Sequence, residues 1–209
     1  MESLAYSVAK KLLQLKTFRL QVTNPFMWAN GWSAPIYFDD RKILSYPYMR
    51  NFTKLELARH VAEMYPDADV IAGVAVNAIA LSALVAEQVG LPLIYVHPFP
   101  KDHGLENQIE GELRPRQKVV VIENQINEGV NLEHVVEAIR NNGCTVLGVV
   151  TIFNYDLEQA TQHLQEADIE ITALTNFSSL LEAAQEMELW DDECRKILCE
   201  WHKSPENYE

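Results

Sequence analysis

Polar side chains crowd into the segment 118–131, KVVVIENQINEGVN, which could carry the chemistry of this chain. The segment begins with an apolar run at 119–123 that is typical of a strand buried on both faces. Helical spacing of apolar residues starts at Leu132. A strand, a polar loop and a helix N-terminus form the arrangement with which α/β proteins hold anions, because free backbone N–H groups and the helix dipole converge there.

The side chains of this loop favour a different ligand. Glu128 brings a carboxylate to the place where an anion would bind, and amides fill several of the other positions. The carboxylate could act as a general base, or it could only stabilise the first turn of the next helix, by about 0.3–1 kcal/mol. Both interpretations exclude a phosphate from the same place. A cleft lined in this way suits a neutral or cationic small molecule better than a polyanion.

The rest of the chain supplies a scaffold in which strands alternate with helices. Strands are predicted at 17–22, 36–38, 69–75, 91–96, 119–123, 145–153 and 169–174, and helices at 2–15, 47–64, 78–89, 157–166, 178–187 and 191–201, with one more from Leu132 onward. This alternation predicts an α/β fold with a doubly wound, mostly parallel sheet, in a single domain. Ligands bind such sheets at the carboxyl ends of the strands, so the loops 75–78, 97–106 and 123–131 should surround one cleft.

The charge of the chain limits its partners. Thirty acidic residues against 17 basic ones give a formal net charge of −13, which argues against nucleic acid and against an anionic membrane surface. Three cysteines without metal-ligand spacing fit a reducing compartment. The first residues show neither a signal peptide nor a membrane span, so a cytoplasmic protein is expected.

Five segments carry a family resemblance: NPFMWANGW, FDDRKILSYP, DVIAGVA, KDHGLENQIEG and KVVVIEN. Together they resemble the orotate phosphoribosyltransferases of Bacteroidetes-like bacteria over nearly the whole chain. The resemblance implies a type I phosphoribosyltransferase fold and a homodimer, with a small hood formed or braced by residues 1–40 and parts of the C-terminus. It also implies transfer of a phosphoribosyl group from phosphoribosyl pyrophosphate (PRPP) to orotate, with magnesium, to give orotidine monophosphate in pyrimidine biosynthesis. Lys101 and His103 match the family's catalytic lysine and histidine.

The phosphate loop departs from the family pattern. Where the family reads E-D-L-I-S-T-G-G-S, residues 123–131 read E-N-Q-I-N-E-G-V-N. Asn124 thus replaces one of two acids that hold the ribose hydroxyls, and Glu128 and Val130 replace a threonine and a glycine that wrap the 5′-phosphate. A carboxylate about 4 Å from one phosphate charge costs roughly 4 kcal/mol at an effective dielectric constant near 20. A β-branched residue also blocks close backbone approach and disfavours any positive φ. We therefore expect a degenerate PRPP loop.

Other positions around the cleft also depart from the family. The pyrophosphate loop, A-T-G-G or A-T-G-A in the family, reads Ala75, Val76, Asn77, Ala78; an arginine is His97, a lysine is Pro98, and a hood lysine is Ser33. Asp39 and Asp40 stand for an Asp-Asn pair, with Arg41 and Lys42 retained. Positive charge is lost where anions should bind. Because local rules fail only at this cleft, we expect its function to be altered.

These observations define the predicted site. Its ligand-binding pocket consists of Val76, Asn77, His97, Phe99, Glu123, Asn124, Gln125, Asn127, Glu128, Gly129, Val130 and Asn131. Its hood and substrate side consists of Trp32, Ser33, Phe38, Asp40, Arg41 and Lys42. The candidate catalytic residues are Lys101, His103 and, as a new base, Glu128. No metal site or cofactor is predicted; a metal on Glu123, Glu128 and Asp39 or Asp40 is a weaker alternative, because no spacing fixes such ligands.

Three functions remain open from the sequence. The first is a rebuilt small-molecule pocket on this fold, with native transfer lost or very weak. The second is a working orotate phosphoribosyltransferase with a divergent loop. The third is an inactive structural or regulatory dimer partner.

Overall fold

A parallel sheet forms the centre of the computed structural model, which describes residues 2–28, 30–100 and 107–208. Its strand order is β10-β9-β8-β5-β6-β7, and only β7 runs antiparallel to its neighbour. The strands are β5 (Val70–Val74), β6 (Leu93–Val96), β7 (Ile109–Glu110), β8 (Lys118–Ile126), β9 (Thr145–Asn154) and β10 (Ile171–Asn176). This arrangement confirms the predicted α/β fold with a mostly parallel sheet.

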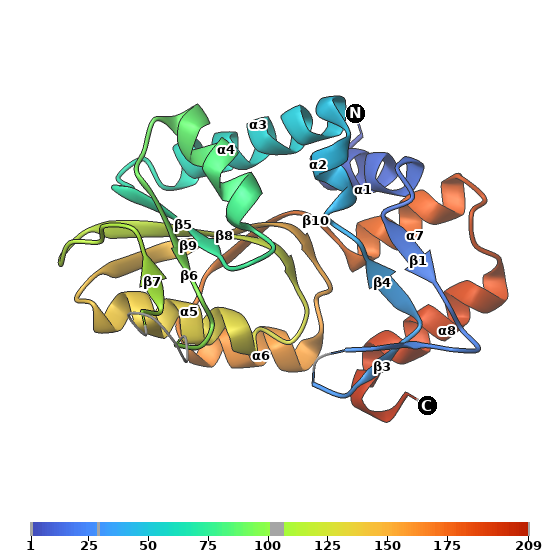
Figure 1. The fold of residues 1–209 in the computed structure, drawn as a ribbon. Helices are drawn as coiled ribbons and strands as arrows, with labels where there is room; N and C mark the ends of the chain where they lie inside the picture. The colour runs from blue at the N-terminus through green and yellow to red at the C-terminus, as the bar shows by residue number, and fades with distance from the viewer. Residues whose placement is uncertain (1, 29, 101–106, 209) are drawn as a thin grey trace.

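Helices cover both faces of this sheet (Figure 1). Helices α3 (Pro47–Met64) and α4 (Ile79–Val89) lie on one face, and α5 (Val130–Asn141) and α6 (Glu158–Glu166) lie on the other. Side chains of β8 alternate between the two cores: Val120 and Ile122 pack in the core of α3 and α4, while Val121 packs in that of α5. Such double burial explains the uninterrupted apolar run at the start of β8.

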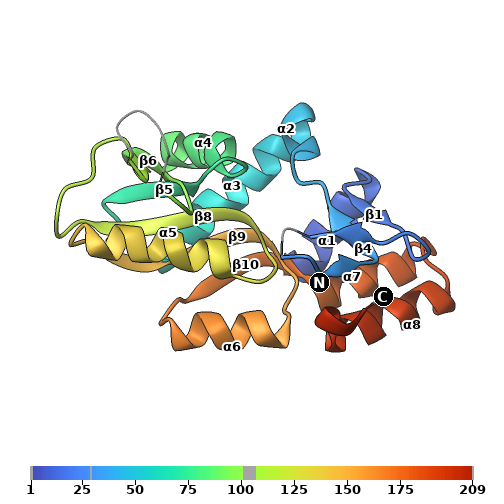
Figure 2. The ribbon, with the colours of Figure 1, turned by 60° about the horizontal axis from the view of Figure 1, so that its bottom comes forward.

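The hood gathers the two ends of the chain on one side of the sheet (Figure 2). It contains α1 (Leu4–Gln14), β1 (Phe18–Leu20), β2 (Phe26–Met27), β3 (Ser33–Ala34), β4 (Ile36–Phe38), α2 (Lys42–Ser45), α7 (Phe177–Glu186), α8 (Asp192–Lys203) and the 3₁₀ turn Pro205–Asn207. Trp201 in α8 donates a hydrogen bond from Nε1 to the carbonyl oxygen of Ser33, at 3.2 Å. The Trp28 ring lies 5.6 Å from that of Trp201. Helix α8 is thereby packed against the hood hairpin, which consists of the antiparallel strands β2 and β3.

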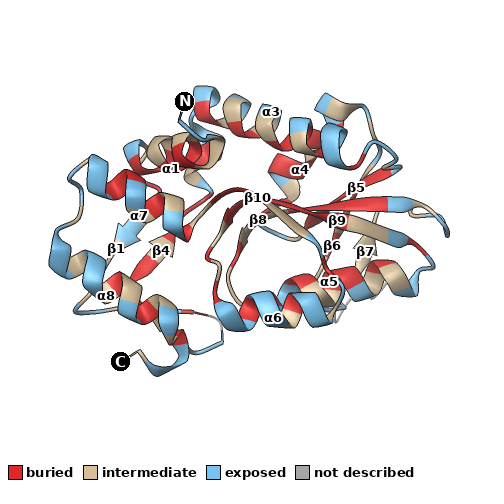
Figure 3. Ribbon diagram, turned by 180° about the vertical axis from the view of Figure 1, so that it is seen from behind, coloured by how far each residue is buried: buried red, intermediate tan, exposed pale blue. Residues whose placement is uncertain are grey.

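Burial follows the same layers (Figure 3). Buried residues run along the central strands and along the faces of the helices that point toward them, while the outer helix faces are exposed. Phe38 in β4 is fully buried and stacks on Phe18, with ring centroids 4.6 Å apart. None of the helices in the described ranges is both long and apolar enough to cross a membrane.

Strand β8 is longer than predicted, and this changes the site. The prediction ended the strand at Glu123 and treated the next residues as a loop. The structure continues it to Ile126, because β9 offers a parallel partner: Gln125 pairs with Phe153 and Ile126 with Asn154. Long-range pairing overrides the weak strand preference of Asn and Gln at these positions. Residues 123–126 therefore alternate in direction, and they do not all face one cleft.

Candidate active site

A cleft of about 460 Å³ lies at the carboxyl end of β8. Nine of the predicted pocket residues line it: Asn77, Phe99, Glu123, Gln125, Asn127, Glu128, Gly129, Val130 and Asn131. Three further residues complete the lining, namely Asn30, Ile126 and Leu132. Ile126 was not among the predicted pocket residues. Asn30 comes from the aromatic hood loop, where its Oδ1 accepts a hydrogen bond from the Trp32 backbone N–H at 2.8 Å.

The turn between β8 and α5 depends on one glycine. Gly129 has a φ of 82°, a conformation that L-residues rarely adopt, and it directly precedes the first residue of α5. A Cβ atom at this position would lie 2.8 Å from Cγ of Leu164 in α6. The turn is therefore fixed against α6.

One expectation about this turn is wrong. Glu128 does not lie in the first turn of the helix, because α5 begins at Val130, and the acidic residue of that turn is Glu133. Stabilisation through the helix dipole is thus the role of Glu133. Val130 has no positive φ, so it carries no backbone strain. Its branched side chain, 43% exposed, still stands at the mouth of the cleft.

Glu123 lies at the floor of the cleft. Part of its side chain remains accessible, and its Oε1 accepts a hydrogen bond from the backbone N–H of Asn124 at 2.7 Å. Burial, assisted by the negative charge of Asp40, raises the pKa of Glu123 to about 8. Near neutral pH this side chain is therefore mostly a neutral acid, which can donate a hydrogen bond to a ligand.

Glu128 forms part of the cleft wall. Its side chain is partly buried, and burial raises the pKa of its carboxyl. No hydrogen bond or ion pair joins it to another residue of the described chain. A carboxylate removed from water without a partner favours an occupant that brings a proton donor or a positive charge.

The structure places Asn124 away from the cleft, contrary to its expected role as a ribose-facing residue. Its side chain is 5% exposed, and its Nδ2 donates to the carboxylate of Asp40 and, at 3.0 Å, to the carbonyl oxygen of Asn77. The amide thus joins the end of β8 to the residue pair after β4 and to the loop after β5. Asp40 is buried as well, which raises its pKa against the opposing effect of the Asn124 hydrogen bond.

The retained hood cations do not reach the cleft lining. Arg41 donates from Nε to Asp39 at 3.0 Å. Lys42 donates from Nζ to the carbonyl oxygen of Lys16 at 2.6 Å. Of the other residues predicted on the hood side, Phe38 belongs to the core, Ser33 lies in β3, and Trp32 lines a cavity beside the cleft.

The segment after β6 holds Phe99 against α5. Gln108 donates from Nε2 to the carbonyl oxygen of Pro98 at 3.1 Å, and the Phe99 ring lies 4.9 Å from that of His134. His97 lies outside the cleft lining, and its Nε2 is buried without a hydrogen-bond partner among the described residues. Val76, 72% exposed, is also outside the lining. Lys101 and His103 lie outside the described residues.

Comparison with known proteins identifies the family. The chain is 48% identical to the orotate phosphoribosyltransferase of Porphyromonas gingivalis over 208 residues, which covers 100% of this chain and 99% of that protein. It is 40% identical to the orotate phosphoribosyltransferase of Enterococcus faecalis, with the same coverage. The chain belongs to the orotate phosphoribosyltransferase family. No protein-family profile matches it.

Solved structures of this family and its relatives share the fold. The UMP synthase of Leishmania donovani superposes with a TM-score of 0.79 at 25% identity, over 94% of this chain and 42% of that one. The orotate phosphoribosyltransferase of Aeropyrum pernix superposes with a TM-score of 0.73 at 22% identity, over 88% of this chain and 99% of that one. The fold is therefore the type I phosphoribosyltransferase fold that the sequence predicted.

The resemblance to the orotate phosphoribosyltransferase family implies magnesium. The acidic side chains near the cleft are not arranged as ligands for this ion. Within residues 2–28, 30–100 and 107–208, no three His, Cys, Asp or Glu side chains come together as metal ligands. Asp40 is engaged by a buried amide, and Glu123 is held mostly neutral near pH 7. Magnesium is usually held by one or two carboxylates together with substrate phosphates, and neither Asp40 nor Glu123, as placed here, offers it a free ionised carboxylate; no step below passes through the ion.

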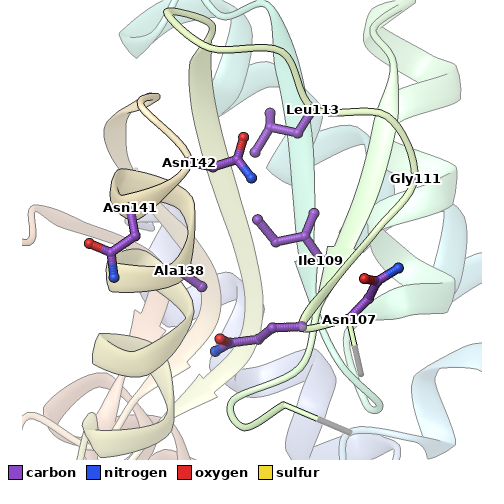
Figure 4. Close-up of a pocket in the computed structure, with 8 residues that line it drawn as sticks. Asn107, Ile109, Gly111, Leu113, Ala138, Asn141 and Asn142 are labelled. Carbon is purple, nitrogen blue, oxygen red and sulfur yellow. The ribbon is translucent and has the colours of Figure 1, made fainter. Parts of the chain in front are cut away.

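A second cavity of about 410 Å³ lies between β7 and the second half of α5 (Figure 4). Its wall carries Asn107, Ile109 and Leu113 on one side and Ala138, Asn141 and Asn142 on the other. It contains none of the predicted site residues and no titratable side chain. We assign it no role in chemistry.

Proposed function

We propose that this member of the orotate phosphoribosyltransferase family binds a neutral or cationic small molecule at the end of β8, and that phosphoribosyl transfer is lost or very weak. The observation that carries the proposal is Glu128: a partly buried carboxylate, without a partner among the described residues, in the wall where the family pattern has a threonine for the sugar phosphate. Val130, at the mouth, adds bulk where that pattern has a glycine.

Electrostatics supports this proposal. At about 4 Å and an effective dielectric constant near 20, one carboxylate opposes one phosphate charge by roughly 4 kcal/mol. Every 1.4 kcal/mol is about tenfold in affinity. Protonation of Glu128 would relieve the repulsion but would consume binding energy at neutral pH, even with its raised pKa.

The cleft also offers little compensation for a polyanion. Along the described part of the cleft, the lining contains no lysine or arginine. Arg41 and Lys42 are held by Asp39 and by the Lys16 carbonyl. A ligand with several phosphate charges would therefore lose more on desolvation than these walls return.

A second candidate function is phosphoribosyl transfer itself. It is favoured by the 48% identity to a protein named orotate phosphoribosyltransferase and by the presence of Lys101 and His103 in the sequence. A fold alone does not decide between these functions, because function depends on the site.

An assay of orotidine monophosphate formation from orotate, PRPP and magnesium tests the proposal. The Porphyromonas gingivalis relative, purified in the same way, is the positive control. We expect turnover at least about a thousandfold below that control, as the roughly 4 kcal/mol of repulsion implies. Turnover within about tenfold of the control would favour the second function.

We also propose that the chain forms a homodimer, as the family resemblance implies.

The third function, a purely structural partner, makes a separate prediction: no small molecule that fits the cleft should raise the melting temperature. Binding to the folded state must raise it by mass action.

A further inference from the structure

A cavity beside the cleft extends the site beyond the proposed function. It has a volume of about 420 Å³ and lies between the hood hairpin, the β8–α5 turn and the start of α6. Its lining consists of Asn30, Trp32, Glu128, Val130, Leu157, Gln159, Ala160 and His163. Asn30, Glu128 and Val130 also line the main cleft, so these residues form the partition between the two spaces. Its volume falls in the range of about 300–1,000 Å³ that is usual for small-ligand pockets.

Most of this side cavity is apolar. Trp32 contributes a partly buried indole, and Leu157 and Ala160 present side chains from the buried face at the start of α6. Val130 adds a branched side chain from the partition. An aromatic or aliphatic body could displace water from these surfaces with a gain in free energy.

The charge in the cavity is negative and unpaired. Among the described residues of the lining, His163 is the one basic side chain, and its Nε2 lies 2.7 Å from Oε2 of Glu133. Glu128 has no such partner among the described residues. The carboxylate is partly removed from water at the edge of an apolar space, which is the environment in which a bound cation gains most.

We propose that this side cavity is a binding site for a small organic cation, with an apolar or aromatic body against Trp32 and Leu157 and a protonated amine against Glu128. The proposal shares Glu128 with the proposed function but does not depend on the loss of PRPP binding. A cation site built on this carboxylate fits the large net negative charge of the chain, which raises the local concentration of cations.

The test uses three probes of one shape on the full-length protein. They are 2-phenylethylamine, 2-phenylethanol and 3-phenylpropionate, which present a cation, a neutral hydroxyl and an anion on the same ring. Calorimetric titration and the intrinsic tryptophan fluorescence, to which Trp32 contributes together with Trp28, Trp190 and Trp201, report binding. We expect the amine to bind in the millimolar range or better, the alcohol to bind at least about tenfold more weakly, and the anion not to bind. Added salt should weaken the binding of the amine.

Two variants test the role of the Glu128 carboxylate. Glu128→Gln keeps the shape of the side chain and should weaken amine binding about tenfold while leaving the affinity for the alcohol nearly unchanged. Glu158→Gln removes the same charge from an exposed position in the first turn of α6, outside the cavity lining, and should change neither.

Several results would overturn this inference. They are equal affinity of the unmodified protein for the amine and the alcohol, no binding of the amine at high millimolar concentration, or equal effects of the two substitutions. The comparison of probes needs no variant, so it decides the question even if Glu128→Gln folds poorly. Tight binding of PRPP would contradict the proposed function. It would not contradict this cation site, because none of the three probes carries a phosphate.

Discussion

Asn124 donates a hydrogen bond from its buried amide to the carboxylate of Asp40, across the junction between the sheet and the hood. The family pattern has an aspartate at the first of these positions and an asparagine at the second. Both positions have changed in this chain, and the structure shows the two side chains in contact. The pair therefore retains one amide and one carboxylate, with their places exchanged.

A double-mutant cycle measures this exchange. Asn124→Asp would bring a second carboxylate against buried Asp40 and should lower the free energy of unfolding by on the order of 2–3 kcal/mol. Adding Asp40→Asn should recover most of the loss, because the amide and the carboxylate are then complementary again. Urea unfolding at neutral pH of Asn124→Asp, Asp40→Asn and the double variant gives the three values that the cycle needs. Strictly additive effects would show that the two side chains do not act as a pair.

The contact between Asn124 and Asp40 also decides how a variant with the family's phosphate loop should be designed. Glu128→Thr with Val130→Gly removes the carboxylate and the branched side chain from the turn. Asn124→Asp belongs in this variant only together with Asp40→Asn. We expect the variant with all four substitutions to bind inorganic phosphate or PRPP measurably more tightly than the unmodified protein. The control Glu158→Gln, which removes one exposed charge, should show no gain in affinity. Absence of any gain would place the defect elsewhere in the cleft.

Glu123 should make stability depend on pH. Its folded-state pKa of about 8 lies above the value of an exposed glutamate, so the folded state holds this proton more tightly than the unfolded chain does. Stability contributed by the neutral acid is complete below the unfolded pKa of about 4.3 and is lost as the pH rises through about 8. Glu123→Gln should remove this loss, by up to a few kcal/mol at high pH.

The measurement is the difference in unfolding free energy between the unmodified protein and Glu123→Gln from about pH 4 to pH 9. Taking the difference cancels the contribution of Glu128, whose pKa is also raised, and leaves from Asp40 only the part that is coupled to Glu123 by charge. A flat difference across this range would contradict the assignment of the buried proton to Glu123.

Gly129 should tolerate no side chain. Gly129→Ala forces an L-residue to a φ of 82° and places Cβ 2.8 Å from the Leu164 side chain, so we expect a loss of about 2–4 kcal/mol of stability. Gly90→Ala is the matched control: its φ is 74°, and a Cβ there meets nothing within 4 Å. The control should lose only about 1 kcal/mol, measured by the same urea unfolding. Equal losses would show that Leu164 yields freely.

The sequence predicts the scaffold well because apolar spacing is a local signal. The apolar run at 119–123 predicts a strand, and Pro47 predicts the start of α3. Neither prediction needs information about distant residues. The end of β8 is different. Asn124 and Gln125 have weak strand preferences, and the conformation of this end of the strand, Ile126 included, is decided by pairing with β9.

The sequence predicted the position of the candidate site better than the roles of the individual residues in it. The rule that ligands bind at the carboxyl ends of strands brought Glu123, Glu128 and Val130 to one cleft. It could not show that Asn124 turns away toward Asp40, because that contact joins residues 84 positions apart. The engagement of Lys42 by the Lys16 carbonyl is likewise a tertiary feature that no spacing reveals, whereas the contact of Arg41 with Asp39 joins residues only two positions apart.

Calorimetric titration with PRPP and magnesium tests most directly the claim that the turn after β8 no longer accepts a sugar phosphate. The Porphyromonas gingivalis relative serves as the control under the same conditions. We predict no measurable heat of binding for this protein at millimolar PRPP, against clear saturation for the control. Saturable binding at micromolar PRPP, abolished by substitutions in the turn, would contradict the account.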